Sequence, residues 1–164
     1  MELHLIEKFL PVKARNRPGT PLSPRYITIH HTDNSGPHAD AIAHANYLLS
    51  LEARLRNVSW HYTVDDQCVV KHIPTGEVAW HAGSRQGNTS SIGIEICQHQ
   101  DIDFNAAYER AAQLAALVAN AYQLPEDCIV PHRRWNGKDC PHLLFAGNAG
   151  WDWNRFVQRI NRIR

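Results

Sequence analysis

One short polar segment of the chain, Val130–His142, carries a histidine, a lysine and a cysteine between proline and glycine breaks. His132 and Cys140 are eight residues apart, and Lys138 lies two residues before the cysteine. An imidazole and a thiolate can both reach one zinc ion from a loop of this length. Two ligands do not complete a site, so another segment must supply at least one more.

The best candidate for the third ligand is His30, at the end of the segment Tyr26–His30. Three protein ligands leave one position of a tetrahedral zinc open to water or substrate, as in a catalytic site. A structural zinc usually has four ligands, often in close pairs, and the sequence contains no C-x-x-C pair. On spacing alone the alternative remains that His132 is a loop histidine and Cys140 a buried thiol.

Hydrolysis of an amide at such a zinc needs two further groups. Zinc lowers the pKa of bound water toward ~7, and a carboxylate can take the water proton and pass it to the leaving amine. Glu95 fits this role, because a carboxylate among isoleucines is costly to bury without a partner. Lys138 fits as a group that stabilises the oxyanion. The alternatives are a Glu95 that faces water at a sheet edge and a solvated loop lysine.

Period-two alternation predicts where these side chains point. In Tyr26–His30 the isoleucines share one face of the expected strand, so His30 lies on the other face. In Ser91–Cys97 the isoleucines again share a face, and Glu95 lies opposite. A polar loop follows His30, and functional groups in α/β proteins commonly gather where strands end.

The remaining pattern predicts a single α/β domain with a mixed central β-sheet flanked by helices. Residues 1–24 form a proline-rich N-terminal arm, which we read as a short helix or arm followed by an extended segment. Further strands are expected at 60–64, 68–73 and 129–130, and helices at 37–55, 104–122 (capped by Asp103) and 151–163, with a loop at 82–90.

Composition limits the possible partners and location. The chain has 164 residues, 43% of them hydrophobic, which suits one globular domain. A formal net charge of +1 gives no field that would attract nucleic acid, so we expect no nucleic-acid partner. The N-terminus lacks the pattern of a signal peptide and no apolar run could span a bilayer, so we expect cytoplasmic synthesis without membrane insertion. We expect a monomer.

The cysteines do not suggest a disulfide framework. Cys68, Cys97 and Cys128 are irregularly spaced in apolar runs, and the chain has enough apolar residues to fold without cross-links. We therefore expect these three to be buried free thiols.

Taken together, the motifs resemble the zinc-dependent N-acetylmuramoyl-L-alanine amidases of the type-2 amidase family, which are related to peptidoglycan recognition proteins. The resemblance covers residues 26–142, the motif-bearing core, and is greatest to catalytic domains of phage and prophage lysins. The matching segments are Ile27–Thr32, Ser59–Asp66, Trp80–Gly83, Asn88–Cys97 and His132–Pro141.

The resemblance implies one zinc ion per chain, bound by His30, His132 and Cys140, with Glu95 as the catalytic acid/base and Lys138 assisting. It also implies cleavage of the amide between N-acetylmuramic acid and L-alanine in bacterial peptidoglycan. The enzyme would reach the cell wall after lysis or through a membrane lesion. His31 is a rival to His30 as a ligand, but strand alternation would send it to the opposite face.

The chain also departs from the family pattern. Some relatives carry a catalytic tyrosine where this chain has Trp60, so Trp60 is expected to line the substrate cleft instead. His61, Trp80 and His81 are further candidate substrate contacts, with packed or hydrogen-bonded aromatic residues as the alternative. We expect residues 1–164 to be one catalytic domain, with a C-terminal helix at 151–163 and no separate wall-binding domain.

Two other functions are compatible with these motifs. A non-catalytic recognition module of the same fold would bind wall fragments and leave them intact, but the chain keeps every residue of the catalytic set. A structural-zinc domain would need a fourth ligand, for which His142 is a poor geometric fit.

Overall fold

A mixed β-sheet organises the protein. The computed structural model describes residues 3–164, in which six strands lie in the order β1-β4-β3-β5-β2-β6. Among the described strands, β3 and β4 form the antiparallel pair and the other neighbours are parallel. The strands are β1 (Leu5–Glu7), β2 (Tyr26–His31), β3 (Tyr62–Val64), β4 (Val69–Lys71), β5 (Ser91–Ile96) and β6 (Ile129–Pro131).

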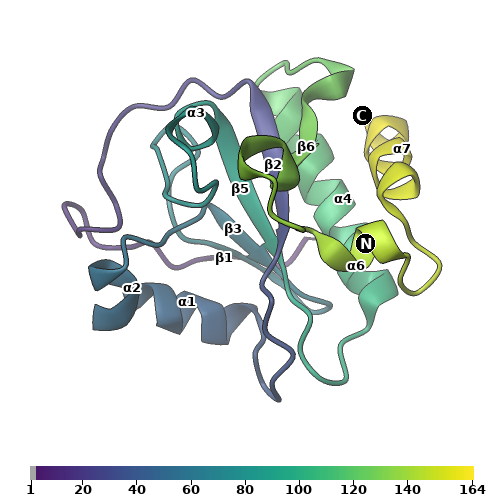
Figure 1. Cartoon of the computed structure of the whole chain (residues 1–164), viewed down its shortest axis with the longest axis horizontal. Helices are drawn as coiled ribbons and strands as arrows, with labels where there is room; N and C mark the ends of the chain where they lie inside the picture. The colour runs from purple at the N-terminus through teal and green to yellow at the C-terminus, as the bar shows by residue number, and fades with distance from the viewer. Residues whose placement is uncertain (1–2) are drawn as a thin grey trace.

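Helices flank this sheet, as the sequence predicts. Figure 1 shows α4 and α7 together beside β2 and β6, away from α1 and α2. The longest helix, α4, packs against β5 and β3, and α7 packs on α4, whereas α1 contacts β3 and β4. The helices are α1 (Ala41–Leu49), α2 (Leu51–Leu55), α3 (Arg85–Asn88), α4 (Phe104–Ala121), α5 (Arg133–Asn136), α6 (His142–Ala146) and α7 (Trp153–Ile163), with a short 3-10 helix at Glu126–Cys128.

The two faces of the central strands β2 and β5 differ, because one packs into the apolar core and the other presents His30 and Glu95. Isoleucines of β2 and β5 are fully buried in the main core, together with the apolar face of α4. Burying each such side chain contributes about 1.5–3 kcal/mol relative to leaving it exposed. His31 shares this face and lies against Tyr108 of α4, with 3.3 Å between His31 Nε2 and Tyr108 Oη. His30 and Glu95 therefore occupy the opposite face, as alternation predicts.

Helix starts follow side-chain caps. Asp103 accepts hydrogen bonds from the backbone N–H groups of Asn105 and Ala106, which confirms the predicted start of α4. The final helix begins at Trp153 rather than Trp151, because Asp152 caps it.

Three local predictions need correction. The expected helix over 37–55 is two helices, because Ser50 is extended and its hydroxyl caps α2. The expected loop over 82–90 contains α3, capped by Ser84. The N-terminal arm contributes a strand, β1, which pairs with β4 instead of forming a helix.

The cysteine prediction is confirmed, since Cys68, Cys97 and Cys128 are buried and free. Among the residues that the structure describes, no helix combines the length and apolar character needed to cross a bilayer.

The N-terminal arm is held to the domain by a half-buried ion pair. Arg17 donates two hydrogen bonds to Glu77, at 2.7 and 2.8 Å, and a third to the carbonyl of Leu10 at 2.7 Å. The neighbouring Asn16 amide donates to the carbonyls of Leu48 and Val58. Apart from the bond to Leu10, which lies within the arm, these bonds tie the arm to α1 and to the segments that follow α2 and β4.

This pair predicts a pH-dependent stability. The hydrogen bond from Arg17 holds the pKa of the Glu77 carboxyl below its ordinary value. The pair therefore stabilises the fold above the ordinary carboxyl pKa, and that contribution is lost as the pH falls through the lowered pKa. Glu77→Gln should lower stability by about 1 kcal/mol or less at pH 7. Thermal melts of both proteins should differ at pH 7 and converge as the pH falls through the lowered pKa of Glu77; a constant difference would contradict the assignment.

Candidate active site

Three potential metal ligands converge at one end of the sheet. His30 lies near the end of β2, His132 directly follows β6, and Cys140 precedes α6. One ligand atom from each lies within 4.8 Å of the others. His30 Nδ1 is 3.0 Å from His132 Nδ1 and 3.9 Å from Cys140 Sγ. The structure thus brings together the three residues that the sequence analysis selected.

Strand pairing explains how distant segments meet. Strand β6 pairs in parallel with β2, with Pro131 opposite Ile29, and the His132 N–H donates to the Ile29 carbonyl at 3.3 Å. His132 is therefore placed beside the end of β2 next to His30.

The chain between His132 and Cys140 folds back through one helical turn. Gly137 ends α5 with φ of 79°, a conformation in which a Cβ atom is strained. The Arg133 N–H then donates to the Cys140 carbonyl at 3.2 Å, which closes the loop. The thiol consequently returns to the imidazole that begins the segment. This helical turn was not predicted from the sequence.

Glu95 lies beside the cluster on the same face of the sheet. It is opposite His30 on β2 and Thr63 on β3, and its Oε1 is 3.8 Å from His30 Nδ1. Its Oε2 is buried with no hydrogen-bond partner among residues 3–164. Burial raises the pKa of Glu95 to about 8, against the opposing effect of the Lys138 ammonium. Glu95 is therefore a central-strand carboxyl and not one at a solvated edge.

The protonation states follow from burial. Desolvation holds the pKa of His30 well below its ordinary value and lowers that of His132 as well. Both imidazoles are therefore neutral at pH 7, which is the form that binds a metal. Burial also raises the pKa of the Cys140 thiol to about 12. A thiol in this position ionises only when a cation compensates its charge.

These donors fit a zinc ion. Two neutral imidazole nitrogens and one buried sulfur form a set that zinc prefers. Without a proton or a cation between them, the lone pairs of His30 Nδ1 and His132 Nδ1 would repel at 3.0 Å. Within residues 3–164 these three side chains form the one His/Cys/Asp/Glu cluster with metal-ligand spacing.

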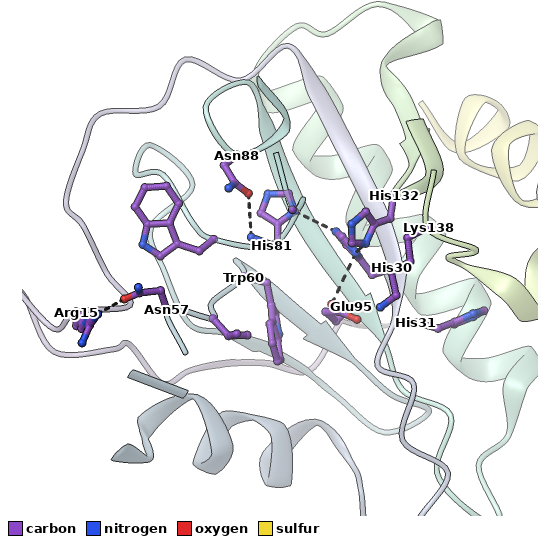
Figure 2. A pocket seen from close by; sticks show the side chains of 13 residues that line it. Arg15, His30, His31, Asn57, Trp60, His81, Asn88, Glu95, His132 and Lys138 are labelled. Atoms are coloured by element: carbon purple, nitrogen blue, oxygen red, sulfur yellow. Dashed lines mark hydrogen bonds and ion pairs between the residues drawn. The ribbon is translucent and has the colours of Figure 1, made fainter. Parts of the chain in front are cut away.

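A third histidine, His81, lies beside the cluster and contacts His30 (Figure 2). His81 Nδ1 is 3.0 Å from His30 Nε2, and His81 Nε2 is 3.2 Å from the carbonyl of Ser91. The side-chain oxygen of Asn88 accepts from the backbone N–H groups of His81 and Ala82, at 3.0 and 2.8 Å. The loop that carries His81 is therefore fixed by an amide from α3.

Two cavities meet at the cluster. The first has a volume of about 630 Å³ and extends from His30 and His132 past Trp80 to Arg15. Figure 2 shows Arg15 and Asn57 at the far end of this cavity from His30. The second has a volume of about 510 Å³ and runs along α1, past Tyr47 and Arg56. Both are lined by Val58, Trp60, Glu95 and Lys138.

The predicted substrate contacts are placed differently from one another. Trp60, Trp80 and His81 line the first cavity, and Lys138 is exposed at the junction. The Trp60 N–H donates to Thr63 Oγ1 at 2.7 Å, so the indole ring is fixed as a wall of the cavity.

His61 is fully buried and lies outside the linings of both cavities, and its ring nitrogens contact the Glu77 carbonyl and the Gly93 N–H. The structure therefore gives His61 a packing position rather than a place in the cleft.

Some cavity residues carried no usable signal in the sequence. Arg15, Asn57 and Arg56 reach the two cavities from the arm and from the segment after α2. They are isolated polar residues in polar loops, where a solvated side chain is the ordinary outcome. Asn88 belongs to a motif, but its hydrogen bonds depend on α3, which was not predicted.

Comparison with known proteins identifies the class to which this fold and site belong. A family model for N-acetylmuramoyl-L-alanine amidases matches residues 19–143. The chain is 43% identical over 144 residues to the N-acetylmuramoyl-L-alanine amidase XlyA of Bacillus subtilis (strain 168), covering 87% of this chain and 48% of XlyA. It is 40% identical over 156 residues to CwlH of the same organism, covering 93% of this chain and 59% of CwlH. The chain belongs to the N-acetylmuramoyl-L-alanine amidase family.

Solved structures agree with this membership. The catalytic domain of XlyA superposes with a TM-score of 0.88 and 41% sequence identity, covering 96% of this chain and 99% of that domain. The structure of PlyL gives a TM-score of 0.81 at 30% identity, covering 98% of this chain and 97% of that one. The chain spans about half the length of the curated relatives that it matches.

Proposed function

We propose that this protein is a zinc-dependent N-acetylmuramoyl-L-alanine amidase. It hydrolyses the amide that joins the lactyl group of N-acetylmuramic acid to L-alanine in bacterial peptidoglycan. The observation that carries the proposal is the convergence of His30, His132 and Cys140 beside Glu95, where two cavities meet. Family membership supports the same reaction.

The proposed metal site uses the three converging side chains. His30 and His132 would contribute nitrogen and Cys140 sulfur to a single zinc ion, which leaves one coordination position for a non-protein ligand. Such an ion, when bound, acts as a Lewis acid that polarises a carbonyl and makes water more acidic.

Glu95 is proposed to move the proton. Burial raises the pKa of Glu95 to about 8 in the metal-free site, and the charge of a bound zinc ion would lower it, so that the carboxylate could accept a proton and later donate it. In the first step Glu95 takes a proton from the attacking water, and in the second it delivers that proton to the departing nitrogen of L-alanine.

Lys138 is proposed to stabilise the negative charge that develops on the carbonyl oxygen. Its ammonium belongs to the linings of both cavities and acts on the pKa of Glu95. A fixed positive charge at this place favours the tetrahedral intermediate over the planar amide.

The two cavities suit a substrate with two parts. The scissile amide separates a sugar from a peptide, so both parts must extend away from Glu95. We propose that they occupy the cavities on either side, with Trp60 as the shared wall. We further propose that residues 1–164 constitute one catalytic domain acting on the bacterial cell wall.

The alternatives are supported less well. A recognition module would not need a carboxyl group beside a complete ligand set, as Glu95 is. A structural zinc would need a fourth ligand, and His142 lies against the ring of His31, with centroids 5.5 Å apart, on the other face of β2.

The reaction can be assayed on purified cell walls. The protein should contain about one zinc per chain, and it should release new amino groups without new reducing sugar ends. Removing zinc with a chelator should abolish the release, and adding zinc back should restore it. New reducing ends without amino groups would indicate a glycosidase. Wall binding without either product would favour the recognition module.

A further inference from the structure

We propose that His81 is a positioning residue that fixes the tautomer of His30, so that Nδ1 of His30 is the atom offered to the metal. This inference rests on the proposed zinc site and goes beyond it, because it assigns a role to a side chain that is not itself a ligand. His81 also belongs to the lining of the first cavity, so this role is compatible with the expected contact with substrate.

The first step concerns the outer hydrogen bond of His81. The carbonyl of Ser91 can only accept, so the contact of 3.2 Å requires a proton on His81 Nε2. A neutral imidazole carries one proton, which leaves His81 Nδ1 as an acceptor.

The second step passes this constraint to His30. Its Nε2 lies 3.0 Å from His81 Nδ1, and this contact is a hydrogen bond only if His30 Nε2 carries the proton. The other nitrogen, Nδ1, then has a free lone pair that points toward His132 and Cys140. The Ser91 carbonyl thus sets the tautomer of His81, and His81 in turn sets the tautomer of His30. The hydrogen bond donated by His30 Nε2 also makes His30 Nδ1 a more basic metal ligand.

The backbone is shaped to hold His81 in this place. The ring packs directly over Gly93 of β5, where an added Cβ would lie 2.7 Å from Cγ and 2.8 Å from Nδ1 of His81. Gly93 is therefore required for the ring to approach the sheet. The Asn88 amide fixes the backbone of His81 from the other side. His81 is 8% exposed and forms part of the wall of the first cavity.

The proposal can be tested on the metal-free protein by ¹H–¹⁵N spectra of the histidine rings. In the wild-type protein His30 should carry its proton on Nε2. His81→Leu removes the acceptor and should give a mixture of His30 tautomers. His81→Asn retains an acceptor near the position of Nδ1 and should restore much of the wild-type pattern. A His30 proton on Nδ1 in the folded wild-type protein would overturn the proposal, whether or not the variants fold.

Zinc affinity gives a second readout, from competition with a chromophoric chelator. His81→Leu should bind zinc about 10- to 100-fold more weakly than wild type, and His81→Asn should recover part of the loss. The matched control is His72→Leu, another buried histidine, whose ring bonds to Thr63 and away from the cluster. Equal affinities for wild type and His81→Leu would overturn the proposal, as would equal weakening in the control. A wild-type protein that hydrolyses no wall would count against the proposed function alone.

Discussion

Glu95→Gln is expected to lower the rate of amide hydrolysis by about 10²- to 10⁴-fold, which is the usual contribution of a general acid/base. The amide cannot accept the water proton or deliver one to the leaving nitrogen. It has nearly the same size as the carboxyl group, so the packing around β5 should survive. Zinc content should stay near that of wild type, because Glu95 is not one of the three clustered ligands.

The measurement is the initial rate of amino-group release, with zinc content determined on the same samples. Glu109→Gln provides a matched control, because this carboxylate pairs with Arg159 between α4 and α7, on the other side of the sheet. Its rate should equal that of wild type. A fully active, zinc-loaded Glu95→Gln protein would remove Glu95 from the reaction.

Cys140→Ser should have the second large effect, a loss of zinc. Serine has no proton that it readily gives up, so the anionic ligand is replaced by a neutral hydroxyl. We expect zinc binding to weaken by more than the roughly 10- to 100-fold associated with an outer hydrogen bond. Activity at limiting zinc should fall in proportion to occupancy.

Cys128→Ser is the control for the loss of a buried thiol. Cys128 is fully buried just before β6 and lies outside the metal cluster. It should change stability modestly and leave zinc affinity unchanged. Equal zinc affinities for Cys140→Ser and wild type would show that the sulfur is not a ligand.

The part of the site that could be predicted from the sequence follows from the alternation of side chains along the strands. Alternation separates His30 from His31, and the structure places His31 against Tyr108 on the helix-covered face. The same alternation puts Glu95 on the face of His30, and parallel pairing of β2 with β5 makes the two residues neighbours. The alternation of side chains along a strand depends only on neighbouring residues, so it can be predicted from the sequence without knowledge of the fold.

Other features depend on tertiary contacts and left no local pattern. The contact of His81 with His30 requires the register of β5, the small volume of Gly93 and the turn fixed by Asn88. His61 follows Trp60 directly, yet it turns into the core because Gly93 and Glu77 supply partners there. Adjacent aromatic residues in one motif thus take opposite roles, which the motif alone does not separate.

The most direct test of the central claim uses a defined muropeptide in water enriched in ¹⁸O, with products weighed by mass spectrometry. We predict two products, a sugar that ends in a free lactyl carboxyl group carrying one ¹⁸O atom and a peptide with a free N-terminal L-alanine. The zinc chelator should prevent both from forming. Cleavage within the sugar chain or within the peptide, with the lactyl amide left intact, would contradict the account.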